Sequence, residues 1–580
     1  MLLLGAGMAP RPFAAPSRGK VRAVASPVHI VPLGGLGEVG MNCLAIEAGG
    51  RIAVVDCGVL FTDEPFGVDV LAPDLGWLVE RREQVGAVFL THGHEDHVGA
   101  LPFLLRHLPV PVYGTRFTLA MVKGRLEEAG VHADLREVAP GDVVPAGDGA
   151  PLRAEFIAVT HSIPDACALA LTTPQGVIVH SGDFKIDERP VRGPGMDLER
   201  LEALGRAGVR LLLSDSTNAE RSGWSRSESA VGPGLQDAMA EATGRVFVAT
   251  FSSNAHRLQQ VVEAAASTGR RLALLGRGMV QNFDIARVLG QLTEPGWMPV
   301  NADEARRLPP RELAVLVTGS QGEPRAALGR LARGEHPDLK VHAGDTVLLS
   351  SRQIPGNELQ VGRLVNELCA RGALVRWDGH PPLHATGHAQ EAEQRRLLQL
   401  VRPERFMPIH GEYRQLARHA AHAAGEGVAP ERCHLLTDGQ VLELTDAGAR
   451  ILPERVRSGR IALVRDEGGA VEVPDAVIED RRLLAEFGLL LVVVQVDGAS
   501  GALLGEPEFQ ARGVAGLEGH EAELGGEVRR ALEELAGDSL SHGEAAWRAA
   551  RVEAVRSALR RWFRRATGRR PLVEPVVVVR

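Results

Sequence analysis

The sequence predicts an α/β protein built from several layered domains, and three observations lead to that prediction. Short apolar runs alternate with segments of helical periodicity, which is typical of α/β folds. Many of these runs end in clusters of Gly, Ser, Asn, Asp and His, the place where such folds carry binding side chains. The chain has 580 residues, more than one hydrophobic core usually serves, so we expect about two to four domains.

Composition narrows the class of protein. Five cysteines are scattered without a CxxC pair, which argues against a disulfide framework and suits a reducing cytoplasm. The longest apolar run, residues 487–496, is too short to span a bilayer, so no membrane partner is expected. The formal net charge of −8 gives no general attraction to nucleic acid, so any nucleic-acid site must be a local groove.

The N-terminal segment, residues 1–27, contains no acidic residue and predicts a disordered tail. Two alternatives stay open: a weak transit peptide, and a start codon assigned too early, since Met8 is also available.

Order is expected to begin with strands. Residues 29–33 form an apolar run, and residues 42–47 and 52–57 form two more, joined by Gly49-Gly50 as a hairpin. Residues 85–90 predict a buried strand. Beyond it, helices and strands are expected to alternate along the chain: helix 100–107, strand 110–113, helix 117–129, and strands 154–160, 168–172 and 176–180.

The run THGHEDH, residues 91–97, follows the predicted strand 85–90 and concentrates metal-ligating side chains. His92 and His94 can be aimed at one metal by the loop, and Asp96 and His97 at another. Glu95 is expected to point elsewhere. The alternatives are a polar surface loop or a purely structural zinc site.

His161 and Asp183 each follow a predicted strand, and either one alone would usually be structural. Together with Asp56-Cys57-Gly58 and HGHEDH, they resemble the metallo-β-lactamase superfamily, whose fold is an αββα sandwich with a two-zinc site. The resemblance implies the following roles: one zinc on His92, His94 and His161, the second on Asp96 and His97, Asp183 as the bridge between them, and Asp56 as a residue that orients ligands.

The last zinc ligand expected in this superfamily is His410, in the run PIHGEYR. More than 200 residues separate it from Asp183, far more than one loop, so a whole domain must be inserted. Within the gap, apolar runs end in polar clusters, the pattern of a parallel sheet with helices such as 255–269. These clusters are SDSTN after 211–213, FSSNAHR after 247–250, TGSQGEP after 315–317 and SSRQIPGNE after 348–349.

The series SDSTN, SSNAHR, TGSQGEP, IPGNE, HATGHA and PIHGEYR resembles the β-CASP nucleases, and among them most closely the bacterial ribonuclease J family. The likeness runs from about Val31 through the C-terminal region. Asp215, His388 and His410 match the family's motifs A, B and C, and a histidine at motif C goes with members that act on RNA. One departure is HATGHA, where the family more often has HVSGHA; Thr386 keeps the hydroxyl.

The resemblance implies a zinc-dependent ribonuclease with 5′→3′ exonuclease and endonuclease activity on single-stranded RNA, in RNA maturation and mRNA decay. Mn²⁺ could replace Zn²⁺, and Asp215, His388 and Asp183 would be catalytic. A pocket for a 5′-monophosphate would be formed by Ser253, Asn254, His256, His384, Ala385, Thr386, Gly387 and His388. The alternatives are a β-CASP DNA nuclease, another enzyme of the superfamily, and a non-catalytic RNA-binding subunit.

The C-terminal part predicts strand 489–496, helices 526–535 and 544–565, and a terminal strand after Pro571. The resemblance implies that it promotes homodimers or homotetramers, with an RNA degradation complex as a further expected partner. A solvated basic helix is the alternative for the arginine-rich residues 541–580. Gly67 and Asp69 match a stretch that can hold a structural Ca²⁺, with a simple turn as the alternative.

The expected domains follow from these observations. They are a tail (1–27), the two parts of a metallo-β-lactamase domain (28–205 and 379–455), a β-CASP domain (206–378), a linker (456–472) and a C-terminal domain (473–580).

Overall fold

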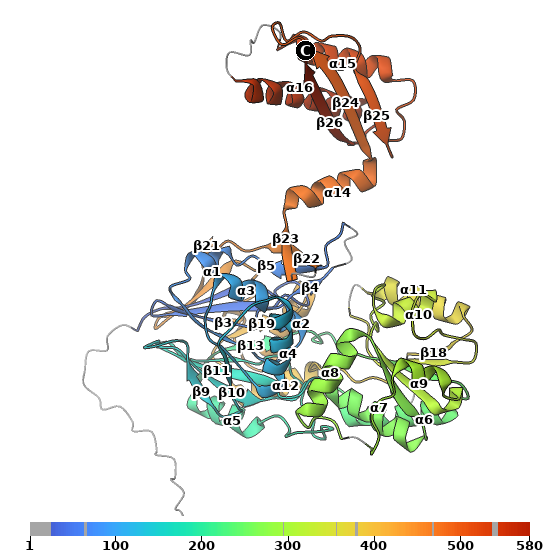
Figure 1. Cartoon of the computed structure of the whole chain (residues 1–580). Helices are drawn as coiled ribbons and strands as arrows, with labels where there is room; N and C mark the ends of the chain where they lie inside the picture. The colour runs from blue at the N-terminus through green and yellow to red at the C-terminus, as the bar shows by residue number, and fades with distance from the viewer. Residues whose placement is uncertain are drawn as a thin grey trace, which may run out of the picture. The chain divides into compact units, whose positions relative to one another are not determined.

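The computed structural model describes residues 25–62, 66–293, 295–354, 357–377, 381–466, 469–535 and 543–580. Its described residues divide into two compact units. Unit 1 contains those up to residue 60 and those from 73 to 459; unit 2 contains those from 61 to 72 and from 460 to 580 (Figure 1).

Unit 1 is built on two sheets. The first has eight strands in the order β21 (Gly448–Arg455), β20 (Gln440–Thr445), β1 (Val28–Gly34), β2 (Cys43–Ala48), β3 (Arg51–Val55), β6 (Val85–Phe89), β7 (Val112–Gly114) and β8 (Leu135–Glu137). The second has six, in the order β19 (Phe406–Ile409), β13 (Val209–Asp215), β12 (Gly176–His180), β11 (Cys167–Thr173), β10 (Arg153–Ala158) and β9 (Val143–Pro145). The predicted hairpin of β2 and β3 is confirmed as an antiparallel pair.

One hydrophobic cluster fills the space between these sheets. Ile30, Ile46 and Phe89 contribute to it from the first sheet, and Phe156 and Leu211 from the second. The accompanying helices are α1 (Gly76–Glu80), α2 (Glu95–Val98), α3 (Leu101–His107), α4 (Arg116–Glu128), α5 (Leu198–Ala207), α12 (Glu391–Val401) and α13 (Tyr413–Gly425). The arrangement is the αββα sandwich that the resemblance to the metallo-β-lactamase superfamily implies (Figure 1).

The segment between β13 and β19 folds into the predicted inserted domain. Its five strands are all parallel, in the order β15 (Arg271–Leu275), β16 (Leu313–Val317), β14 (Val246–Ala249), β17 (Thr346–Leu349) and β18 (Leu374–Arg376). Each residue of β14 and β16 is buried, as expected of a sheet covered on both faces. The covering helices are α6 (Val231–Glu241), α7 (Ala255–Ser267), α8 (Arg277–Val288), α9 (Ala302–Arg307), α10 (Ala327–Arg333) and α11 (Glu358–Ala370).

Two expected domain limits need correction. Strand β13, placed in the inserted domain by the limit at residue 206, pairs with β12 and β19 in the sandwich. The sequence of a buried strand does not show which sheet the strand joins, and for this reason the predicted limit at residue 206 is wrong. Residues 456–472, expected as a linker, contain strands β22 (Arg460–Asp466) and β23 (Gly469–Val473). These two strands form an antiparallel pair, and Ala462 and Val473 are buried against Val68.

Unit 2 contains two sheets. One is four-stranded, in the order β23, β22, β5 (Val70–Pro73) and β4 (Leu60–Phe61). The other is three-stranded, in the order β25 (Glu508–Arg512), β24 (Leu489–Val496) and β26 (Leu572–Val579), and the helices are α14 (Asp475–Phe487), α15 (Glu521–Glu533) and α16 (Glu544–Ala566). One face of the last helix is apolar: Trp547, Val555, Leu559 and Trp562 lie in the core, with Val552 partly buried beside them.

The tail expected over residues 1–27 lies outside the described residues up to residue 24. Among the helices that the structure describes, none combines the length and apolar character needed to cross a membrane.

A buried ion pair holds the start of the inserted domain. Glu228, in a short 3-10 helix (Glu228–Ala230), accepts hydrogen bonds from Arg257 Nε at 2.7 Å and Nη2 at 3.0 Å. Arg257 Nη1 also donates to the Leu383 carbonyl at 3.2 Å, in the chain that returns to the sandwich. Both side chains are almost fully buried, so each depends on the other to offset its desolvation.

Replacing Arg257 with methionine should therefore lower the free energy of unfolding by about 3–5 kcal/mol, because Glu228 would remain buried without its counter-charge. Urea unfolding followed by circular dichroism measures the change. The control is Arg287→Met, which removes a partly exposed pair with Asp284 and should cost less than about 1 kcal/mol. Equal losses in the two variants would contradict this role for the buried pair.

Candidate metal centre and catalytic site

The ends of three neighbouring strands bring the first polar groups together. Asp183 follows β12, Asp215 ends β13, and His410 follows β19. Strands β13 and β19 are parallel, with Asp215 paired to Ile409. Because parallel strands end at the same edge, residues far apart in the chain meet there. The loop 91–97 reaches this edge from β6 of the facing sheet.

The first cluster consists of His92, His94 and His161, one nitrogen from each lying within 4.8 Å of the others. His94 Nδ1 lies 3.0 Å from His92 Nε2 and 3.2 Å from His161 Nε2. His161 Nδ1 donates a hydrogen bond to the Gly387 carbonyl at 2.7 Å, which leaves Nε2 as the ligand nitrogen. A Cβ at Gly387 would stand 2.7 Å from the His161 ring, so only glycine allows this approach.

The second cluster consists of Asp96, His97, Asp183 and His410. Asp183 Oδ2 lies 3.2 Å from both His97 Nε2 and His410 Nε2, and Asp96 Oδ2 lies 3.5 Å and 3.6 Å from the same two nitrogens. Asp183 Oδ2 also lies 3.7 Å from His92 Nε2 and 3.8 Å from His161 Nε2 in the first cluster. This one carboxylate therefore stands between the two groups.

The histidines of the two clusters differ in their protonation. Burial, followed by the neighbouring imidazoles, holds the pKa of His161 well below its usual value, so the ring is neutral. Burial alone would raise the pKa of Asp183, but the imidazoles of His410, His97 and His388 outweigh it and hold this pKa well below the usual range. In the second cluster the carboxylates, Asp183 first, outweigh burial and raise the pKa of His97 and of His410, so a metal ion binding there would displace protons from these two rings.

His410 is held in an unusual position beside two carboxylates. It is buried, and neither ring nitrogen makes a hydrogen bond of good geometry among the described residues, although Nε2 lies 3.2 Å from Asp183 Oδ2 and 3.6 Å from Asp96 Oδ2. Its φ of 52° lies in the left-handed region, which costs energy for a residue other than glycine and is concentrated at functional sites. A metal ion held by Nε2 together with these carboxylates would satisfy all of these atoms, so the residues present fit the group.

Several supporting residues lie behind these ligands. His97 Nδ1 donates to Asp56 Oδ2 at 2.8 Å, which agrees with the orienting role expected for Asp56. The Thr91 hydroxyl donates to the same carboxylate at 2.7 Å, and the Asn42 amide lies 3.1 Å from His97 Nε2. Thr91 and Asn42 were not expected. The position of Thr91 next to His92 was a usable signal, whereas Asn42 had none. Glu95, expected to point away, forms an ion pair with Arg125 on α4.

Asp215 and His388 form a hydrogen-bonded dyad beside the metal clusters. His388 Nδ1 donates to Asp215 Oδ2 at 2.8 Å, and Asp215 Oδ1 accepts from the Thr217 hydroxyl at 2.8 Å. Burial would lower the pKa of His388, but Asp215 and then Asp183 outweigh it and raise this pKa to about 9. The dyad leaves Nε2 of His388 as the nitrogen that can transfer a proton.

The residues expected to form a phosphate pocket fall into two groups. Asn254 and Thr386 already make hydrogen bonds within the protein, whereas the His384 ring does not. Asn254 is buried and its side-chain oxygen caps α7, accepting from the Arg257 amide at 2.9 Å. Thr386 Oγ1 accepts from Asn218 Nδ2 at 3.0 Å. The ring nitrogens of His384 are buried without a hydrogen-bond partner among the described residues, and burial, then Arg257 and Lys185, holds the pKa of His384 well below its usual value. Ala385 is buried, and Ser253 is half-buried just before α7.

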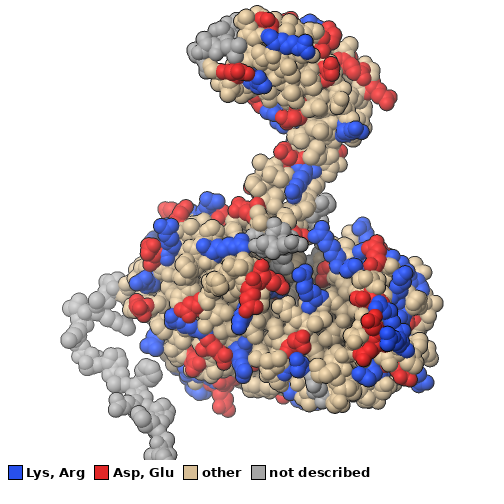
Figure 2. All heavy atoms as spheres, in the orientation of Figure 1, with Lys and Arg blue, Asp and Glu red and all other residues tan. Residues whose placement is uncertain are grey.

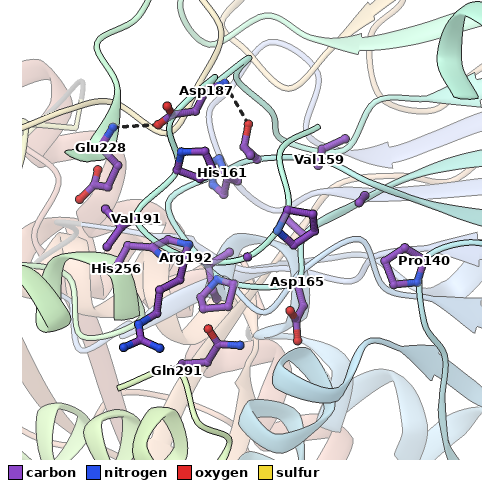
Figure 3. A pocket seen from close by; sticks show the side chains of 18 residues that line it. Pro140, Val159, His161, Asp165, Asp187, Val191, Arg192, Glu228, His256 and Gln291 are labelled. Atoms are coloured by element: carbon purple, nitrogen blue, oxygen red, sulfur yellow. Dashed lines mark hydrogen bonds between the residues drawn. The ribbon is translucent and has the colours of Figure 1, made fainter. Parts of the chain in front are cut away.

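A cavity of about 70 Å³ lies next to the first cluster, and His161 and His256 both line it. Figure 3 shows Arg192, His256 and Gln291 gathered on one side and Pro140 on the opposite side. The sandwich and the inserted domain thus share the walls of a space beside the candidate ligands.

Gly67 and Asp69 lie in unit 2, before β5. The guanidinium of Arg481 donates to the Phe66 carbonyl at 2.7 Å and approaches the place of a Gly67 Cβ to 3.1 Å. Among the described side chains, no group of three potential ligands includes Asp69. The calcium site stays a prediction.

Four family models match consecutive parts of the chain. The metallo-beta-lactamase superfamily matches residues 36–222, and the beta-CASP domain of ribonuclease J matches residues 243–368. The RNA specificity domain of Zn-dependent metallo-hydrolases matches residues 382–435, and the C-terminal domain of ribonuclease J matches residues 476–579. The first match extends past β13, in agreement with the placement of that strand in the sandwich.

Relatives that match most of the chain are named ribonuclease J or ribonuclease J2. The chain is 38% identical over 578 residues to the ribonuclease J of Mycolicibacterium smegmatis, which covers 99% of this chain and 100% of the relative. It is 40% identical over 491 residues to the ribonuclease J of Synechocystis, covering 84% and 76%. It is 35% identical over 554 residues to ribonuclease J2 of Bacillus subtilis, covering 95% and 98%.

The bridging position of Asp183 generates a test. Asp183→Ala should release metal from both clusters, whereas Asp96→Ala, which alters only the second cluster, should release about one equivalent. Inductively coupled plasma mass spectrometry on the purified protein measures the metal content. Retention of wild-type metal content by Asp183→Ala would show that the carboxylate is not a shared ligand.

Proposed function

Because the chain belongs to the ribonuclease J family, we propose that it is a zinc-dependent ribonuclease that removes nucleotides from the 5′ end of single-stranded RNA and also cleaves internally. The observation that carries the proposal is the pair of ligand clusters, with Asp183 of the second within 4 Å of two histidines of the first, beside the Asp215–His388 dyad. Two zinc ions would bind to His92, His94, Asp96, His97, His161, Asp183 and His410, and Mn²⁺ could replace them. When bound, they would activate water and neutralise charge on the scissile phosphate.

The chain's own residues supply the rest of the chemistry. Asp215 holds His388 through Nδ1, so that Nε2 can protonate the leaving 3′-oxygen or stabilise the charge on the phosphorus. Products would carry a 5′-phosphate and a 3′-hydroxyl. His410 at the third motif position and the relatives' names favour RNA over the DNA nuclease alternative.

A 5′-phosphate would occupy the space near His384, Thr386 and His256. The unpartnered ring nitrogens of His384 support this placement, because a phosphate would supply the hydrogen-bond partner that the described residues do not. Ser253, the Asn254 amide and the Ala385–His388 segment would complete the pocket. The oxygen of Asn254 is committed to capping α7, so only its NH₂ group would serve.

The remaining expectations form part of the proposal. The enzyme would act in the cytoplasm in rRNA processing and mRNA decay, within an RNA degradation complex, and would assemble as a dimer or tetramer through its C-terminal domain. In a revised division, the inserted domain would begin after β13. The second part of the sandwich domain would keep its limits, residues 379–455.

Exonuclease digestion should prefer RNA with a 5′-monophosphate over RNA with a 5′-triphosphate, because the longer, more charged group fits badly in a closed pocket. Thr386→Val should slow this step by roughly fivefold, the loss of one hydroxyl contact, and should affect internal cleavage less. His388→Ala should damage both activities. Single-turnover digestion of RNAs that differ only at the 5′ end measures the preference. Equal exonuclease rates on the two RNAs would contradict the pocket.

A calcium site at Gly67 and Asp69 makes a separate prediction. A chelator that strips calcium but not zinc should lower the melting temperature of the wild type and leave Asp69→Ala unchanged. Differential scanning fluorimetry with and without added Ca²⁺ measures both. An unchanged melting temperature in the wild type would contradict the calcium site and favour the alternative, a simple turn at Gly67 and Asp69.

A further inference from the structure

Arg352 lies where the inserted domain meets the catalytic segment. It follows β17, at the carboxyl edge of the parallel sheet. The buried side chain of Gln321, from the loop after β16, holds the backbone around it: Nε2 donates to the Arg352 carbonyl at 2.8 Å, and Oε1 accepts from the Ile354 amide at 2.8 Å. The position from which Arg352 extends is therefore fixed.

The side chain of Arg352 reaches the sandwich domain. Its Nη1 donates to Asn218 Oδ1 at 3.1 Å. The Nδ2 of the same Asn218 donates to Thr386 Oγ1 and to the His388 carbonyl, both at 3.0 Å. One amide thus separates the guanidinium from the segment that carries the catalytic histidine.

The positive charges of Lys185 and Arg257 are each balanced by a carboxylate, whereas the charge of Arg352 is not balanced in this way by any described residue. Lys185 is buried against Asp187 at 3.0 Å, and Arg257 against Glu228 at 2.7 Å. Among the residues that the structure describes, no carboxylate lies within ion-pair distance of Arg352, and the side chain is half-buried. A guanidinium has five N–H donors in a planar fork, and Asn218 takes only one of these in the described contacts.

The wider surface does not supply a strong positive field. The net charge is −8, and on the visible face of unit 1 basic and acidic side chains are interspersed in Figure 2. An RNA chain carries one negative charge per phosphate, so a local, unbalanced cation beside the site has a large share in its binding.

We propose that Arg352 binds a backbone phosphate of the RNA close to His388, and that Asn218 orients its guanidinium for this contact. The inference deepens the proposed ribonuclease function and rests on it. A planar fork matches two phosphate oxygens at once, which a lysine cannot do. The bound phosphate would also connect the inserted domain to the sandwich, since Arg352 and His388 belong to different domains.

The test compares Arg352→Gln, Arg352→Lys and the control Arg306→Gln. Arg306 is an exposed residue of α9 that pairs with Asp303, so its variant makes the same charge change on the same domain. Binding of a phosphorothioate-linked, 5′-monophosphorylated single-stranded RNA is measured across a series of salt concentrations. The zinc content and melting temperature of each variant are measured alongside.

Arg352→Gln should bind about tenfold more weakly at low salt, and its slope of log affinity against log salt should fall by about 0.7, the share of one phosphate of a single strand. Arg352→Lys should keep the slope and lose a few-fold in affinity, while Arg306→Gln should match the wild type. A wild-type slope in Arg352→Gln would show that the residue is only a structural strut.

A second measurement uses the wild-type protein and does not depend on the folding of a variant. Bound RNA should protect Arg352, but not Arg306, from modification by phenylglyoxal, as read by mass spectrometry of peptides. Equal modification of Arg352 with and without RNA would overturn the proposal. Cleavage of RNA by the wild type is scored separately, so failure of the ribonuclease function is distinguishable from failure of this contact.

Discussion

The carboxylate of Asp183 is the constraint on which the rest of the site depends. Its Oδ2 lies 3.2 Å from His97 and His410 and less than 4 Å from His92 and His161. These histidines follow strands of both sheets of the sandwich, so the ends of β6, β12 and β19 must lie close together. The core between the sheets, which includes Phe89, Phe156 and Leu211, holds these strand ends in place. A closely packed core allows little movement, which suits a site where the ligand atoms of each cluster lie within 4.8 Å of one another.

The inserted domain is joined to the sandwich by packing as well as by chain. A continuous hydrophobic cluster includes Val179 and Leu212 of the sandwich and Val246 and Val248 of the inserted sheet. The pair of Arg257 and Glu228 lies at the same junction and reaches the Leu383 carbonyl just before the HATGHA segment. The wall that faces the metal ligands therefore has a defined position, which a pocket for a nucleotide terminus requires.

Much of the fold and most of the candidate ligands could be predicted from the sequence, because the information is local. An apolar run that ends in HGHEDH places four ligands by itself, and the long gap before His410 announces the inserted domain. The errors arose where local pattern does not identify a partner. Strand β13 looks like any buried strand, and its sheet depends on pairing with β12 and β19. The hairpin of β22 and β23 was hidden by the polar run between its strands.

The residues that sequence reasoning missed are those that act across long separations. Asn218 meets Thr386 from 168 residues away and Arg352 from 134 residues away. Neither an amide in SDSTN nor an arginine in SSRQIPGNE is chemically unusual in its own segment. Their importance comes from the junction of the two domains, where Asn218 divides its amide between the His388 segment and Arg352. An acidic enzyme that must hold an anionic polymer cannot depend on its overall field. It needs cations left unbalanced at the site. Lys185 and Arg257 are each paired with a carboxylate, so of these three cations only Arg352 could serve in the proposed way.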